Sequence, residues 1–210
     1  MEQLHDASYF TTKVYAIKKP EFLDMVKKVS GEYLHKAHER LGEGQHMTVM
    51  TENFYHETSV APFAEYVSQT AWNILQSQGY AMDKLVTFFA EMWTQERNAF
   101  SDMAYHVHNL GSQISAFYFL DVPKGGCQML IHDPRPTKMM INLPEADDKK
   151  VSGATSQIVL TPEAGTLVFT NAWLPHSFTK NMSMEPTRFV HMNLGVVVAP
   201  EQTDPNVEVL

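Results

Sequence analysis

The second half of this sequence reads as a succession of short β-strands, and that pattern limits the fold more than any other feature. Clusters of glycine, proline and charge, such as those at 123–126 and 144–150, separate runs rich in β-branched and aromatic residues. A sandwich or jelly roll suits so many short strands, because it leaves few edges exposed. After a strand that begins at Leu85, we expect strands at about 103–108, 114–121, 127–132, 138–142, 157–160, 166–170 and 187–198.

The first half predicts helices. Apolar residues recur at helical spacing from Pro20 to about Leu41 and from about Ala61 to Gln78. Residues 11–17 suggest an opening strand, and residues 44–60 read as a loop. The fold class is therefore α+β, with N-terminal helices before an all-β core. We expect 1–210 to be a single domain, with mainly helical support over 1–84, the β core over 85–198 and a tail over 199–210.

Composition disfavours several classes of protein. A formal net charge of −8 makes nucleic acid an unfavourable partner. The single cysteine, Cys127, cannot form an internal disulfide, so a reducing compartment is the natural setting. Neither an apolar run long enough to span a membrane nor a signal peptide is visible. We expect a cytoplasmic protein with no membrane partner.

Two histidines on one expected strand, His106 and His108, indicate a metal site. Residues i and i+2 of a strand point to the same face, so both imidazoles can converge on one ion. A third histidine, His176, follows a later strand in Gly165-Thr-Leu-Val-Phe-Thr-Asn-Ala-Trp-Leu-Pro-His176. Mononuclear iron enzymes commonly use two histidines and one carboxylate. The third ligand is therefore either His108 or a carboxylate from elsewhere, such as Asp121 or Asp133.

The order of these motifs resembles the iron(II)- and 2-oxoglutarate-dependent oxygenase superfamily, and more narrowly its small members from bacteria and marine phages, which are similar to prolyl hydroxylases. The resemblance covers about residues 85–198. The residues that carry it are His106-Val-His108, Ser115-Ala-Phe-Tyr-Phe-Leu-Asp-Val-Pro123, Gly125-Gly126, Asp133-Pro-Arg135, Pro162-Glu-Ala-Gly165-Thr-Leu-Val-Phe169, Trp173-Leu-Pro-His176, and Arg188 with Asn193.

That resemblance implies a double-stranded β-helix, the cupin-like jelly roll, that binds iron(II), 2-oxoglutarate and O2. It implies His106 and His176 as metal ligands, with His108 in place of the usual carboxylate. Arg188 would bind the distal carboxylate of 2-oxoglutarate. Ser115 shares the strand parity of Phe119 and would face the same pocket, Asn193 would line it, and Tyr118 would reach it if a bulge shifts the parity.

The implied reaction is hydroxylation of a C–H bond with release of succinate and CO2. The primary substrate is not specified by the sequence; a peptidyl residue such as proline and a small molecule are both open, and Arg135 would be placed to hold it. Two other functions remain open, namely a three-histidine dioxygenase of the cupin type that does not use 2-oxoglutarate, and a non-catalytic jelly-roll binding module. A homodimer is the base-rate expectation for assembly.

Overall fold

The computed structural model describes residue 5, residues 7–108 and residues 111–199. Its strands form two antiparallel sheets that face each other, the arrangement of a jelly roll. The six-stranded sheet has the order β1-β8-β5-β10-β3-β2, with β1 at Tyr15–Lys18, β8 at Thr166–Asn171, β5 at Ser112–Asp121, β10 at Thr187–Val198, β3 at Leu85–Arg97 and β2 at Thr48–Met50. The four-stranded sheet has the order β4-β9-β6-β7, with β4 at Met103–His106, β9 at His176–Phe178, β6 at Met129–His132 and β7 at Gln157–Leu160.

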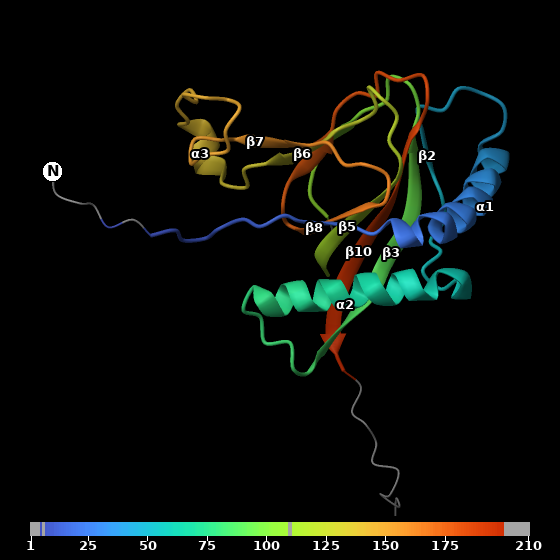
Figure 1. The fold of residues 1–210 in the computed structure, drawn as a ribbon, viewed down its shortest axis with the longest axis horizontal. Helices are drawn as coiled ribbons and strands as arrows, with labels where there is room; N and C mark the ends of the chain where they lie inside the picture. Colours follow the sequence, from blue (N-terminus) through green and yellow to red (C-terminus); the bar gives the residue numbers. More distant parts are fainter. Residues whose placement is uncertain (1–4, 6, 109–110, 200–210) are drawn as a thin grey trace, which may run out of the picture.

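Helices α1 (Leu23–Leu41) and α2 (Ala61–Ser77) cover the outer face of the six-stranded sheet, as Figure 1 shows. Pro20 opens a short 3₁₀ turn that leads into α1, and Gly42 ends α1 with a φ of 74° that favours glycine. Both helices match the expected ranges within a few residues. Among the described residues, neither these helices nor α3 (Pro136–Met140) is long and apolar enough to cross a membrane.

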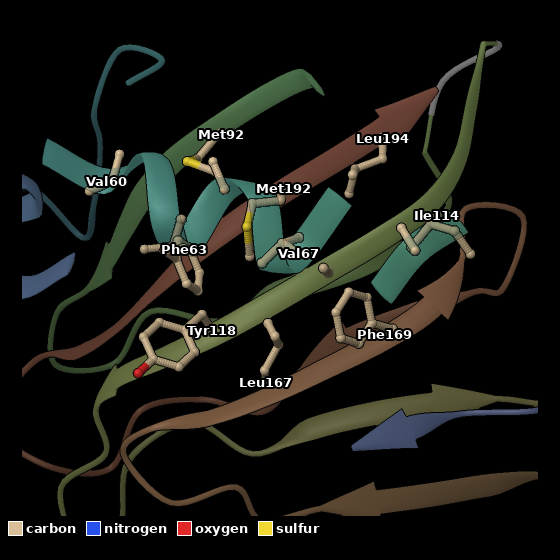
Figure 2. Packing of buried hydrophobic residues seen from close by; sticks show 14 of the residues in the cluster. Val60, Phe63, Val67, Met92, Ile114, Tyr118, Leu167, Phe169, Met192 and Leu194 are labelled. Carbon is tan, nitrogen blue, oxygen red and sulfur yellow. The ribbon is translucent and has the colours of Figure 1, made fainter. Parts of the chain in front are cut away.

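The main hydrophobic core lies between α2 and the six-stranded sheet. Figure 2 shows Phe63 and Val67 of α2 against side chains of four strands, among them Met92 of β3, Met192 of β10 and Tyr118 of β5. Alternate residues of these strands point to the helices because side chains in a strand alternate between faces. This core therefore fixes the parity of β5 and β10, and the other residues of both strands face the interior of the jelly roll.

A second core fills that interior. Phe117, Phe119 and Phe189 from the six-stranded sheet meet side chains of the opposite sheet that include Ile131 and Phe178. Phe178 and Phe189 stack with ring centroids 4.8 Å apart. Aromatic side chains therefore occupy the space between the sheets on one side of the histidines.

Three local expectations were wrong. Residues 138–142, expected as a strand, overlap helix α3, because Pro136 at its first turn presets the helical φ and cannot donate to a ladder. The expected loop at 44–60 contains β2, and β9 had no predicted strand of its own. β2 and β9 have three residues each, which is too short to show a periodic pattern. Of the expected tail, residues 200–210 lie outside the described residues.

Candidate metal centre

Two of the three candidate ligands are neighbours across a pair of strands. His106 ends β4 and His176 begins β9, and these two residues are directly opposite each other in the register. Their ring centroids lie 4.4 Å apart. The Leu-Pro dipeptide before His176 ends the preceding turn, and Leu174 is fully buried beneath it. The antiparallel pairing therefore brings together histidines that are seventy residues apart in sequence.

His108 completes the group from just beyond β4. Its backbone N–H donates to the carbonyl of Ala172 at 3.0 Å, which holds the segment against the turn after β8. Its Nε2 lies 3.1 Å from Nε2 of His176. One ring nitrogen from each of His106, His108 and His176 lies within 4.8 Å of the other two. The structure thus brings all three expected histidines to one point.

The other ring nitrogen of two of these histidines is held by the backbone. Nδ1 of His106 lies 2.8 Å from the carbonyl oxygen of Ala104, and Nδ1 of His176 lies 3.1 Å from that of Leu174. A carbonyl only accepts, so each Nδ1 carries the proton and each Nε2 offers a lone pair. This is the tautomer that metal-binding histidines need.

Burial keeps the rings of His176 and His108 neutral. Desolvation lowers the pKa of His176 to about 4. It also lowers the pKa of His108 to about 3, with a further contribution from the neighbouring imidazoles of His176 and His106. Neutral imidazole is the form that binds a metal ion. Nitrogen atoms about 3 Å apart also suit a shared ion, because metal–nitrogen bonds measure about 2.1 Å in zinc sites. The donor set fits a transition metal.

The two aspartates considered as carboxylate ligands lie elsewhere. Asp121 forms ion pairs with Lys27 and Arg188, at 2.7 and 3.3 Å. Asp133 is held by Arg135 and Lys138, at 2.7 and 3.2 Å. In the described part of the chain neither aspartate joins the histidine group. Of the alternatives that the sequence left open, the geometry favours His108 as the third ligand.

The positions of Arg188 and Tyr118 do not fit the roles expected of them. Both side chains point to the helix-covered face of the sheet, away from the histidines. Arg188 donates to Glu96 at 2.7 Å and to Asp121 at 3.3 Å. Tyr118 packs on Phe63 and donates its hydroxyl to the carbonyl of Lys19 at 2.7 Å. Register shifts do occur in β10, after Arg188 in its pairing with β5 and after Asn193 in its pairing with β3, but they do not turn Tyr118 inward.

Ser115 and Asn193 do face the interior, as strand parity predicts. They are paired across β5 and β10, and the Ser115 hydroxyl donates to Oδ1 of Asn193 at 2.8 Å. The amide nitrogen of Asn193 lies 2.6 Å from Oε2 of Glu91 and 3.2 Å from Nδ1 of His108. The side chain of Asn193 is therefore already engaged with the histidine site.

Sequence reasoning gave no role at the site to three further residues, Glu91, Thr170 and His191. Glu91 is opposite Asn193 in the register, and Thr170 is opposite Ser115. The ring of His191 stacks on that of His108, with centroids 4.5 Å apart. Among the described residues, Thr170 Oγ1 and His191 Nε2 are buried side-chain atoms without a hydrogen-bond partner. Polar residues at alternate positions of β10, His191 and Asn193, were the signal that could have identified these inward-facing polar residues.

Exposed apolar side chains lie next to the histidines in sequence. Tyr105 precedes His106 and faces the outer side of the small sheet, where its ring lies 5.0 Å from that of His132. Val107 lies between the two histidines and alternates with them; Tyr105 and Val107 are 61% and 49% exposed. Trp173, within the turn that leads to His176, is 50% exposed.

Comparisons with known proteins identify relatives of this fold. Residues 91–192 match the family model described as "Putative 2OG-Fe(II) oxygenase". A 2OG-Fe(II) oxygenase family oxidoreductase from Burkholderia pseudomallei has a TM-score of 0.58 at 10% identity, over 87% of this chain and 84% of that one. A prolyl-4-hydroxylase from Pseudomonas putida has a TM-score of 0.58 at 12% identity, over 88% and 93%. The viral collagen prolyl hydroxylase of Paramecium Bursaria Chlorella virus-1 has a TM-score of 0.55 at 13% identity, over 88% and 96%. No curated protein matches the sequence.

Proposed function

Because the chain belongs to the iron(II)- and 2-oxoglutarate-dependent oxygenase superfamily, we propose that it hydroxylates a C–H bond of a peptidyl or small-molecule substrate. The observation that carries this proposal is the convergence of His106, His108 and His176 at one end of the jelly roll. Iron(II), 2-oxoglutarate and O2 together supply the oxidising power, with succinate and CO2 as products. The protein holds and orients these reactants.

The three histidines would hold the iron through their Nε2 atoms. The carbonyls of Ala104 and Leu174 orient the rings of His106 and His176 before any metal arrives. The ring of Phe117 lies 5.1 Å from that of His176 and closes the interior side of the site. This aromatic wall would exclude water from the inner side of a bound metal ion.

The carboxylate groups of 2-oxoglutarate would meet neutral hydrogen-bonding groups, since Arg188 points away. Thr170 and Ser115 are fully buried neighbours on the inner face, and the Thr170 hydroxyl has no hydrogen-bond partner within residues 7–108 and 111–199. The unpartnered Nε2 of His191 lies on the same face. A buried polar atom without a partner costs about 1–3 kcal/mol, so a ligand that satisfies it gains affinity. Ser115, Thr170 and His191 are the residues we assign to this co-substrate.

The primary substrate would bind beside the exposed side chain of Trp173, three residues before His176. An aromatic side chain there favours an apolar or ring-containing group, which a prolyl residue of a peptide provides. Two prolyl hydroxylases among the similar structures agree with this choice.

A second function is favoured by one specific observation. Among the described residues, the candidate ligands are three histidines and include no carboxylate, and Arg188 is engaged on the other face of the sheet. A three-histidine dioxygenase that does not use 2-oxoglutarate would have the same features. The two functions differ in whether 2-oxoglutarate reaches the metal.

The test adds Fe(II) and then 2-oxoglutarate to the purified metal-free protein without oxygen. A weak visible absorption band that needs both additions would support the hydroxylase, and admission of O2 should then yield succinate. Iron binding without the band, and without succinate, would move the second function ahead. A protein that binds no iron would contradict both.

A further inference from the structure

The polar network behind His108 determines which of its ring nitrogens carries the proton. Asn193 is 2% exposed, and its Nδ2 donates to the Glu91 carboxylate at 2.6 Å. A carboxylate only accepts, so this contact fixes the orientation of the amide. The other N–H of Asn193 points to Nδ1 of His108, 3.2 Å away. Nδ1 must then be the acceptor, and the proton of the neutral ring lies on Nε2.

That Nε2–H points into the metal site. The Nε2 atom of His108 lies 3.1 Å from Nε2 of His176. The lone pair of that nitrogen is available because Nδ1 of His176 donates to the carbonyl of Leu174. One directed chain of hydrogen bonds therefore runs from Asn193 through His108 and His176 to the backbone. In this arrangement His108 cannot bind a metal through Nε2, since a ligand nitrogen must be unprotonated.

We propose that the side-chain amide of Asn193 is a two-position switch that couples the tautomer of His108 to the filling of the metal site. The inference rests on the proposed function, because it takes His108 as a ligand. When Nε2 of His108 binds a metal ion, the ring proton moves to Nδ1 and needs an acceptor. Half a turn of the Asn193 amide provides one, because Oδ1 then takes the place of Nδ2.

Glu91 and Ser115 respond to this turn in opposite ways. The Ser115 hydroxyl now donates to Oδ1 of Asn193, and after the turn it would accept from Nδ2 equally well. The Glu91 carboxylate would lose its donor and face an oxygen instead. Glu91 is therefore a positioning residue that favours the metal-free arrangement, although it carries a negative charge beside a cation site.

Because of this opposition, we expect Glu91→Gln to raise the affinity for a metal ion, whereas loss of a negative charge alone would lower it. Glutamine removes the charge but can donate to the turned oxygen of Asn193. We expect Glu91→Gln to bind Zn(II) or Co(II) about tenfold more tightly than the wild type, the scale of one hydrogen bond to a charged group. Simple attraction between a carboxylate and a cation predicts weaker binding instead. The matched control is Glu52→Gln, which makes the same change of charge at an exposed carboxylate paired with Arg40 and should change affinity by less than about threefold.

Long-range ¹⁵N–¹H spectra of the histidine rings test the tautomer directly. In the metal-free wild type, His108 should be protonated at Nε2, and Zn(II) should move the proton to Nδ1. Weaker or unchanged metal binding by Glu91→Gln, or a metal-free His108 protonated at Nδ1, would overturn the switch. Zn(II) binding by the wild type with no change of tautomer would overturn the switch alone. A wild type that binds no Zn(II) would overturn the proposed metal centre as well.

Discussion

Arg188 donates from Nε to Oε2 of Glu96 at 2.7 Å, on the face of the six-stranded sheet that packs against α1. The Glu96 side chain is only 4% exposed, and His38 of α1 contacts its other oxygen at 3.0 Å. Asp121 contacts the same arginine at 3.3 Å and is itself paired with Lys27 of α1. These charges join α1 to the sheet. Arg188 therefore contributes to the stability of the fold.

Replacing Arg188 should lower stability and leave 2-oxoglutarate binding nearly unchanged. Arg188→Met keeps the aliphatic stem but leaves the buried Glu96 carboxylate without its main partner, which costs about 3 kcal/mol when one half of a buried pair is removed. Urea unfolding measures the stability, and titration of the Fe(II) form with 2-oxoglutarate measures the affinity. The double variant Glu96→Gln with Arg188→Met should recover part of the stability. A large loss of 2-oxoglutarate affinity in a folded Arg188→Met protein would restore the arginine to the co-substrate site.

Strand periodicity predicted which residues of β5 face inward. The ten residues of β5 placed Ser115 and Phe119 on the inner face and Tyr118 on the outer one. The role expected of Arg188 came from the order of motifs and not from strand periodicity. Its actual partner, Glu96, is 92 residues away in sequence. The sequence does not show which acidic residue will lie beside a given arginine.

The sequence identified the three histidines that the structure brings together, but not the residues that surround them. His106, His108 and His176 were recognisable because metal chemistry restricts ligand type and spacing. Glu91 was not, because it reaches His108 only through Asn193, and that contact depends on the register of β3 with β10. The short strand β9 and the helix α3 were missed for the local reasons given above.

Loss of His176 should abolish metal binding. His176→Ala removes a fully buried candidate ligand whose lone pair is already oriented, so we expect Co(II) affinity to fall at least about 100-fold. The matched control is His132→Ala, since His132 lies on the neighbouring strand β6 and contacts Ser177 on the outer face of the small sheet. Visible absorption of bound Co(II) reports both variants. Equal losses in the two proteins would show that the metal binds elsewhere.

Thr170→Val should stabilise the free protein and weaken 2-oxoglutarate binding. Valine has nearly the same shape as threonine, and it removes a buried hydroxyl that has no hydrogen-bond partner in the described structure. Stability should rise by about 1 kcal/mol, while 2-oxoglutarate affinity should fall about tenfold if the lost hydroxyl binds this ligand as we propose. Thermal unfolding with and without 2-oxoglutarate measures both effects.

Because Thr170→Val should raise stability but lower 2-oxoglutarate affinity, the variant distinguishes a contact with the ligand from a packing contact in the core. A variant that is less stable and also binds 2-oxoglutarate less well would indicate damage to the core. Unchanged affinity in a stabilised variant would remove Thr170 from the co-substrate site.

The metal-free protein should lose stability as the pH falls below about 6.5, the ordinary pKa of histidine. Burial lowers the pKa of His108 to about 3 and that of His176 to about 4, and it holds the pKa of His191 well below its usual range. Between these values and 6.5 the unfolded chain binds more protons than the folded one, so the free energy of unfolding falls with the pH. Urea midpoints at about pH 7.5 and about pH 5.5, above the range where carboxylates titrate, measure the slope. His108→Gln removes one of these groups, so its stability should fall less between the two pH values. An equal fall in the variant and the wild type would show that His108 is not among the groups that set the slope.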